Sequence, residues 1–356
     1  MIVVNLVHAQ RQDLRLIYSP TKFVQHSQKA TFPTPTQVTL LQASLITQTQ
    51  GSKSWQKYWG NPKLGTNFSY FDYGNPDILG FSYGLTRSIG WNLLDRGKHQ
   101  LSLELGLGLT YITRRYDKLH NPLNSAIGSH LNNLTQIQLS YSYTLTPYLG
   151  LELGGHFSHA SNAKTVTPNS GINSTGMYVG LSTPLSRPKN NLTTSKDSIK
   201  QGRRLGLDVL AGRGFSQYSF TGGYNYATYF GSLGAYYKVS PFLHLIAGGE
   251  YEYSQSVFQF YYEDFDPADV ARRKASNSAV FVATELLFGQ VGFRVQSGYY
   301  LPYPSMSAIS SDFYIKLNFN YFFLPTSYTT QPYIGVLMKT HLSVAQYFGL
   351  VVGVRM

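Results

Sequence analysis

The chain has 356 residues, with 29 Lys and Arg against 17 Asp and Glu, so its formal net charge is +12. Only 13% of the residues are charged, 15% are aromatic and none is Cys. The lack of Cys excludes a disulfide-stapled scaffold and a cysteine-ligated metal centre, and a hydrophobic content of 42% excludes a disordered chain. No apolar run approaches the roughly 20 residues of a membrane-spanning helix. These properties indicate an aromatic-rich, charge-poor β protein.

The first ten residues begin with a short apolar stretch that ends in Val7-His8-Ala9. This resembles the end of a secretory signal, with the small residue Ala9 at the cleavage position, although the basic segment that opens such signals is missing. We interpret residues 1–9 as the remnant of a signal peptide. The alternative is an ordinary N-terminal strand.

Beyond residue 10, runs of about 10–17 residues alternate between apolar and polar or glycine positions, bounded by Gly, Pro, Asn or Asp. Residues 101–111, for example, place Leu at every odd position through Leu109. Such runs are longer than the roughly 5–6 residues usual in soluble sheets, and they fit the strands of an outer-membrane barrel. Because the backbone must be fully paired in lipid, the sheet has to close.

We therefore predict an all-β fold, a closed antiparallel outer-membrane β-barrel of about 16 strands (range 12–16). It would form a single domain over residues 10–356 that crosses the outer membrane of a Gram-negative bacterium many times. Tight turns are expected at residues 95–98, 146–147, 240–241 and 289–290, and longer loops at about 117–130, 162–170, 257–275 and 302–311. Residues 51–62 and 186–202 do not fit this scheme, because they are long on the side where turns should be short.

One hairpin pattern occurs twice, at residues 143–155 and 237–249, but only the first copy is followed by His159 and Ser161. The alternation places both side chains on the lipid-facing side of their strand, and Asn173 on the matching face of the next strand. A His and a Ser two positions apart on one face can come within hydrogen-bond reach, as a Ser nucleophile and its base require. A polar pair that faces lipid is costly unless its substrate is itself a lipid.

The sequence here resembles a known family. His159-Ala-Ser161-Asn162-Ala163, followed by Pro168-Asn169-Ser-Gly171-Ile-Asn173, resembles the signature of the outer-membrane lipid A 3-O-deacylases, the PagL-type acyloxyacyl hydrolases. Segments 70–76, 124–131 and 339–345 resemble the longer members found in Bacteroidetes-type bacteria.

The resemblance implies that Ser161 is the nucleophile, His159 the general base and Asn162 an oxyanion donor. Asn169, with Pro168 and Gly171, would shape the substrate loop. The family's third catalytic residue is a Glu, and this chain has Asn173 at the matching position. An Asn can orient a His by hydrogen bonding but cannot offset the charge of an imidazolium.

The implied activity is hydrolysis of an ester-linked (3-O) hydroxyacyl chain of lipid A, without a cofactor. Lipid A or lipopolysaccharide and other outer-membrane lipids would be the partners. Two alternatives stay open: a catalytically silent barrel, acting as a pore or a lipid-binding structural protein, and an esterase for other membrane lipids.

Basic residues near the expected extracellular strand ends, Arg114, Arg115 and Lys164, could pair with the phosphates of a lipid head group, or form a solvated basic rim. A metal site at His156 and His159 is disfavoured because the two residues lie on opposite faces of a strand. A nucleic-acid partner is disfavoured because the positive residues are scattered. His130 and His341 are expected to be structural hydrogen-bonding residues.

Overall fold

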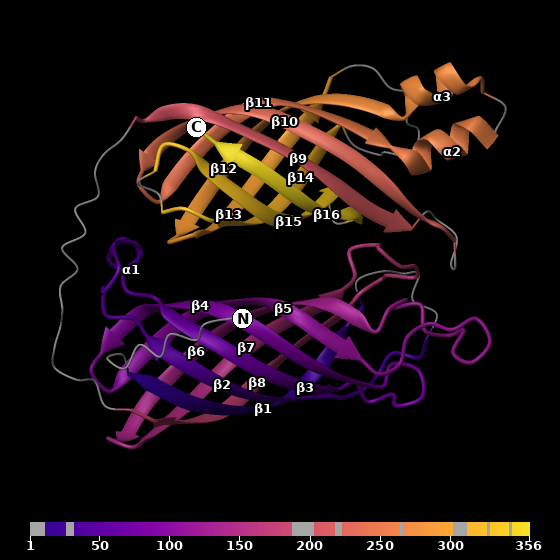
Figure 1. Ribbon diagram of the computed structural model, residues 1–356. Helices are drawn as coiled ribbons and strands as arrows, with labels where there is room; N and C mark the ends of the chain where they lie inside the picture. Colours follow the sequence, from indigo (N-terminus) through magenta and orange to yellow (C-terminus); the bar gives the residue numbers. More distant parts are fainter. Residues whose placement is uncertain are drawn as a thin grey trace. The chain divides into compact units, whose positions relative to one another are not determined.

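The computed structural model describes residues 11–25, 32–186, 203–217, 223–263, 266–301, 312–325, 328–341 and 344–356. Within these ranges the chain forms sixteen antiparallel strands and three short helices (Figure 1). The elements of the first half are β1 (Gln12–Val24), β2 (Val38–Gln48), α1 (Ser54–Tyr58), β3 (Lys63–Asp72), β4 (Phe81–Arg96), β5 (His99–Ile112), β6 (Leu131–Thr146), β7 (Leu149–Ser161) and β8 (Ile172–Pro184). Those of the second half are β9 (Leu205–Gln217), β10 (Asn225–Ser240), β11 (Leu243–Ser254), α2 (Gln255–Glu263), α3 (Ala268–Lys274), β12 (Ser276–Phe288), β13 (Val291–Tyr300), β14 (Phe313–Phe322), β15 (Gln331–His341) and β16 (Val344–Arg355).

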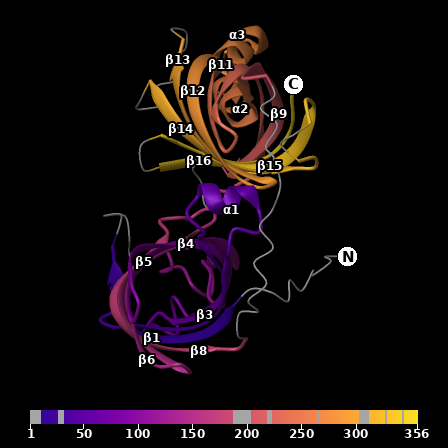
Figure 2. The ribbon, with the colours of Figure 1, turned by 90° about the vertical axis from the view of Figure 1, so that its left-hand side faces the viewer.

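The all-β fold, the closed antiparallel arrangement and the number of about sixteen strands are confirmed. The prediction of a single barrel over residues 10–356 is wrong, because the strands close as two barrels of eight (Figures 1 and 2). β8 pairs with β1 along its length, with Leu181 opposite Leu16, and β16 pairs with β9 in the same way. The alternation within a strand is identical in a barrel of eight and a barrel of sixteen, so it does not reveal where a sheet closes.

The two segments that did not fit a single barrel have separate explanations. Residues 187–202 join the two barrels, so segment 186–202 is a connection between domains and not a turn within a sheet. Segment 51–62 contains helix α1 between β2 and β3. The expected loop at 257–275 contains α2 and α3. The expected signal remnant at residues 1–9 and the expected loop at 302–311 lie outside the described residues.

The outer walls of both barrels are apolar. Alternate residues of each strand point outwards, and the large ones are exposed, such as Leu85, Leu109 and Leu153 in the first barrel and Leu233 and Val282 in the second. A continuous apolar wall of this kind suits contact with lipid, because exposing so large an apolar surface to water would be unfavourable in free energy. None of the helices in the described ranges is long and apolar enough to cross a membrane.

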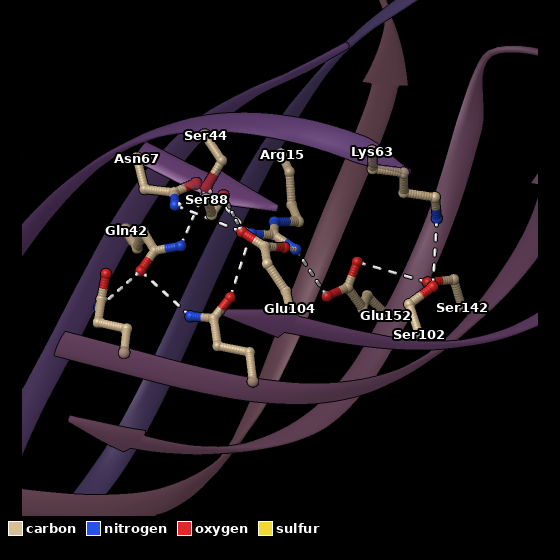
Figure 3. A network of polar contacts seen from close by, with 12 residues as sticks. Arg15, Gln42, Ser44, Lys63, Asn67, Ser88, Ser102, Glu104, Ser142 and Glu152 are labelled. Atoms are coloured by element: carbon tan, nitrogen blue, oxygen red, sulfur yellow. Dashed lines mark hydrogen bonds and ion pairs between the residues drawn. The ribbon is translucent and has the colours of Figure 1, made fainter. Parts of the chain in front are cut away.

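The interior of the first barrel is polar and filled by side chains. Arg15 is at its centre, with Nη1 2.9 Å from Glu104 Oε2 and 3.4 Å from Glu152 Oε1 (Figure 3). Tyr178 donates its hydroxyl to Glu152 at 2.7 Å. An eight-stranded barrel has an interior just wide enough for side chains. The network therefore holds the strands together from inside.

The second barrel has its own network of buried ions. Arg294 lies 2.9 Å from Asp208, and Lys316 and Lys339 lie 2.6 Å from Glu250 and 2.7 Å from Glu252. These side chains are buried. Dense ion pairing inside both barrels gives no support to the alternative of an open pore.

Candidate functional site

The candidate site is at one end of the first barrel, where β7 ends and β8 begins. Ala160 and Ile172 point inwards and are 2% exposed within the apolar cluster that fills this end of the barrel. By the alternation of side chains along a strand, their neighbours His159, Ser161 and Asn173 lie on the opposite, outward face. The strand register pairs His159 directly with Asn173. Two buried aliphatic anchors thus fix the direction of the three polar side chains.

The three side chains form a hydrogen-bonded chain. Nε2 of His159 lies 3.0 Å from Oγ of Ser161, and Nδ1 of His159 lies 2.5 Å from Oδ1 of Asn173. Because an amide oxygen can only accept, Nδ1 carries the ring proton, and Nε2 therefore accepts the hydrogen bond from the Ser161 hydroxyl. Ser161 is 8% exposed and Asn173 is 4% exposed. The arrangement is therefore that of a hydroxyl nucleophile, a base and a residue that orients the base.

The loop after β7 turns sharply next to Ser161. Ala163 and Lys164 have φ values of 52° and 67°, a left-handed conformation that is uncommon for residues with a Cβ. The backbone N–H of Asn162 donates to Oδ1 of Asn169 at 3.0 Å, so the two ends of the loop are tied together. Asn169 thus lies against the peptide that joins Ser161 to Asn162. Pro168 precedes it in the same loop.

Gly171 supports His159 from the β8 side. Its φ is +77°, and a Cβ added at this position would lie only 2.9 Å from Cε1 of the His159 ring. Only glycine adopts this conformation without strain and leaves room for the imidazole. Gly171 also donates its N–H to the carbonyl of Ala126 at 3.0 Å. The ring of His159 therefore rests on a backbone segment that is itself held in place.

The loop between β5 and β6 braces both sides of the site. Ser129 accepts a hydrogen bond from Nδ2 of Asn162 at 2.9 Å, and Ala126 binds Gly171 as described. Asn124, fully buried, holds this loop by four hydrogen bonds: it donates to the carbonyls of Ile78 and Arg114 and accepts from the N–H groups of Ala126 and Ile127. A fully satisfied buried amide of this kind makes a loop rigid.

Ser129 and Asn124 were not among the site residues that the sequence singled out. Segment 124–131 did stand out by its resemblance, but nothing in the sequence says that it contacts residues 162 and 171. That contact arises only when the β5–β6 and β7–β8 loops meet at the same end of the barrel (Figure 1).

The basic residues lie at the same end of the barrel. Arg114 and Arg115 follow β5 and are exposed, and Lys164 lies in the loop after β7. Asp117 is in the same β5–β6 loop. Backbone N–H groups of His120 and Leu119, with the side chain of His120, hold the pKa of Asp117 below its ordinary value. The described contacts do not bring a phosphate-binding cluster together from these residues.

Three histidines that the sequence analysis did not assign to the catalytic site make hydrogen bonds elsewhere. His156 points into the barrel and contacts Ser19 and Thr21, opposite in direction to His159. His130 bonds the carbonyl of Ile112, and His341 bonds the hydroxyl of Tyr300. The described part of the chain contains no group of three or more His, Cys, Asp or Glu residues arranged to hold a metal ion.

Comparisons with known proteins concern mainly the first barrel. Residues 41–182 match the model of the family described as lipid A 3-O-deacylase (PagL). Among solved structures, the outer membrane enzyme PagL is 16% identical, covers 47% of this chain and 97% of its own, and gives a TM-score of 0.32. Neisserial surface protein A is 10% identical, covers 48% and 96%, and gives a TM-score of 0.34. The toluene transporter TodX of Pseudomonas putida is 8% identical, covers 97% and 88%, and gives a TM-score of 0.19. No curated protein matches the sequence.

Proposed function

We propose that the first barrel of this outer-membrane β-barrel protein, in which residues 41–182 match the lipid A 3-O-deacylase family model, hydrolyses an ester-linked acyl chain of lipid A through Ser161 and His159. The single observation that carries the proposal is the hydrogen-bonded chain Ser161–His159–Asn173 on the outer wall. A site on that wall meets a substrate that stays in the membrane.

The chemistry follows from the protonation of the ring. Nε2 of His159 takes the proton of Ser161 as Oγ attacks the ester carbonyl, which gives a tetrahedral oxyanion. Collapse of this intermediate breaks the bond to the sugar oxygen, which leaves with the proton from His159. The remaining acyl-enzyme is hydrolysed by a water that His159 deprotonates in turn, and the fatty acid is released.

Two amides, those of Asn162 and Asn169, lie in the loop that follows Ser161, the proposed nucleophile. Asn162 follows the nucleophile directly, and its N–H is bonded to Asn169. Asn169 accepts that bond through its side-chain oxygen. We assign oxyanion stabilisation to the side-chain amide of Asn162, with Asn169 holding the loop. An oxyanion donor typically contributes about 10²–10³ in rate.

Asn173 takes the position of the family's Glu. It holds His159 in the reactive tautomer through Oδ1. Because it is neutral, it stabilises the imidazolium less than a carboxylate does. Turnover at this site should be limited by that missing charge and not by misplacement of the ring.

The test is mass spectrometry of lipid A from outer membranes that contain the native protein or its Ser161→Ala variant. The native protein should remove one acyl chain, and the variant should remove none. Ser158→Ala is the matched control, because Ser158 is on the same strand but buried inside the barrel, and it should leave the activity intact. Identical spectra for native and Ser161→Ala proteins, with both barrels folded, would refute the proposal. Profiling of all released fatty acids separates lipid A from other membrane lipids as the substrate.

A further inference from the structure

The outer wall of the second barrel carries one charged side chain on the outward face of its described strands, that of Arg213 on β9. Arg213 is exposed, whereas the other charged residues of β9 to β16 take inward positions, as Asp208 does on the same strand. A charge on a lipid-facing wall is unfavourable unless it meets water or an opposite charge. The position of Arg213 therefore requires an anionic partner.

Two aromatic rings hold the guanidinium of Arg213 without using its hydrogen-bond donors. Its Cζ atom lies 5.0 Å from the ring centroid of Phe215 and 5.7 Å from that of Tyr229. The described part of the chain supplies neither an ion pair nor a hydrogen bond to this guanidinium. Its N–H donors form a planar fork that matches a phosphate group, which can accept two of them at once. The rings thus orient a cation whose donors are left for a ligand.

Arg213 lies at the end of the barrel that carries the longer connections. The strand register pairs Arg213 with Tyr229, and Tyr229 with Tyr253, the last outward residue of β11. Helices α2 and α3 follow β11 at this end, whereas two-residue turns at 241–242 and 289–290 close the other end (Figure 1). In outer-membrane barrels the longer connections are extracellular, and aromatic residues mark the membrane interface. Arg213 is therefore at the head-group level of the outer leaflet.

The wall is recessed on the side of Arg213 that faces the membrane centre. The next outward residues are Ala211 on β9 and Gly231 on β10, which are direct partners in the register. A Cβ added at Gly231 would have only the carbonyl oxygen of Leu210 within 4 Å, at 3.7 Å. Small residues at both positions leave space on the apolar wall directly beneath the guanidinium.

The recess continues into a hollow in the same wall. Gly249 of β11 is the diagonal neighbour of Gly231, and the next outward residue of β11, Ala247, is the partner of Ala235. Ala235 and Ala247 line a hollow of about 490 Å³, together with apolar side chains of β11 to β13. Residues 229 to 235 of β10 span about 20 Å. Because the strands tilt by about 35–45°, this is about 15 Å of depth, or one leaflet of a hydrocarbon core about 30 Å thick.

We propose that Arg213 and the recess beneath it bind one membrane lipid that carries a phosphate head group. The phosphate accepts hydrogen bonds from the guanidinium between the rings of Phe215 and Tyr229, and one acyl chain lies over Gly231 towards the hollow. The site belongs to the second barrel and does not involve the candidate catalytic residues, so it does not depend on the proposed function.

The experiment uses an ether-linked dialkyl glycerol phosphate with a photoactivatable group in one chain, and the matching dialkyl glycerol without phosphate. Ether-linked chains exclude hydrolysis by the protein. Purified full-length protein in detergent micelles is labelled over a range of lipid concentrations, and peptide mass spectrometry measures the labelling of β10 and β11. The variants are Arg213→Gln and Arg213→Lys. Arg87→Gln is the matched control, because Arg87 is an exposed arginine on the outer wall of the first barrel.

The phosphate lipid should label β10 and β11 with an apparent affinity about tenfold higher than that of the neutral lipid, as expected for hydrogen bonds to a charged group at an exposed position. Arg213→Gln should abolish this preference, Arg213→Lys should keep part of it, and Arg87→Gln should leave it unchanged. Equal labelling by the two lipids in the native protein, or a preference that survives Arg213→Gln, overturns the site. An equal loss in Arg87→Gln also overturns it, because the effect would then be one of overall charge.

Two further measurements distinguish a lipid site from a site for a free anion. Millimolar inorganic phosphate should not displace the phosphate lipid, since it has no chain to occupy the recess, and displacement would contradict a lipid as the ligand. Gly231→Leu places a side chain in the recess and should lower the labelling by both lipids severalfold, with folding checked by the mobility shift on heating. Unchanged labelling in Gly231→Leu would contradict the placement of the chain.

Discussion

Nδ1 of His159 lies 2.5 Å from Oδ1 of Asn173, across a register in which the two residues are direct partners on neighbouring strands. A neutral amide thus orients the base of the candidate site. The contact fixes the ring tautomer, but it adds no negative charge to balance an imidazolium.

The first prediction tests that contact. Asn173→Asp is nearly isosteric and adds a carboxylate, so it should raise kcat by about tenfold, because an opposite charge stabilises the charged ring. Asn173→Leu should lower kcat by roughly 10²–10⁴, because the ring loses its orienting partner. Initial rates of fatty-acid release from lipopolysaccharide in mixed micelles measure both. An unchanged rate in Asn173→Leu would show that the contact does not serve catalysis.

The second prediction concerns the glycine beneath the base. Gly171→Ala would place a Cβ 2.9 Å from Cε1 of His159 at a φ of +77°, so the ring should move and kcat should fall at least tenfold. Gly97→Ala is the control: its φ is +65°, but nothing lies within 4 Å of the added Cβ. Both variants should lose roughly 1–2 kcal/mol of stability from the left-handed backbone. If Gly97→Ala lowers activity equally, the effect is general strain and not contact with His159.

The third prediction concerns the ions inside the first barrel. Arg15→Met would leave Glu104 and Glu152 buried without their cation, which should cost roughly 3–5 kcal/mol. Adding Glu104→Gln and Glu152→Gln should recover much of that loss, because neither side chain then carries a buried negative charge without its cation. Arg87→Met, at an exposed position on the outer wall, should have little effect. Urea unfolding in detergent micelles measures all of these. A stable Arg15→Met barrel would mean that the interior ions are not needed to hold the strands.

The fourth prediction follows from the two separate closures. A fragment of residues 1–186 contains every strand from β1 to β8 and should fold alone, shift its electrophoretic mobility on heating and keep its hydrolytic activity. A fragment of residues 203–356 should fold alone without that activity. A fragment of residues 1–147 lacks β7 and β8 and should not fold. If the two barrel fragments fold only when mixed, the strands form one barrel after all.

The sequence by itself predicts much of the barrel wall, namely its strands and the direction of their side chains. The alternation predicted strands of the observed length, and it placed His159, Ser161 and Asn173 on the outer face and His156 and Glu152 on the inner face. The sequence can indicate these directions because the direction of a side chain on a strand depends only on its parity relative to its neighbours. The residue types of the site, and the substitution of Asn for Glu, were also visible in the sequence.

Three features were decided by the tertiary structure alone: which strands close each sheet, which residues support the site by hydrogen bonds, and which residues lie beside Ser161 and His159. Which strand pairs with β1 depends on contacts between residues more than a hundred positions apart, such as Leu16 with Leu181. The two-residue alternation of apolar and polar positions is the same whichever strand is the partner, so it does not predict these contacts. The support of Asn162 by Ser129 and of Gly171 by Ala126 exists only because two loops meet at one end of a barrel. Likewise, the strand register alone sets Asn133 and Thr135 beside the nucleophile and base. A local pattern determines which way each residue points, whereas only the closed sheet determines which distant residues meet.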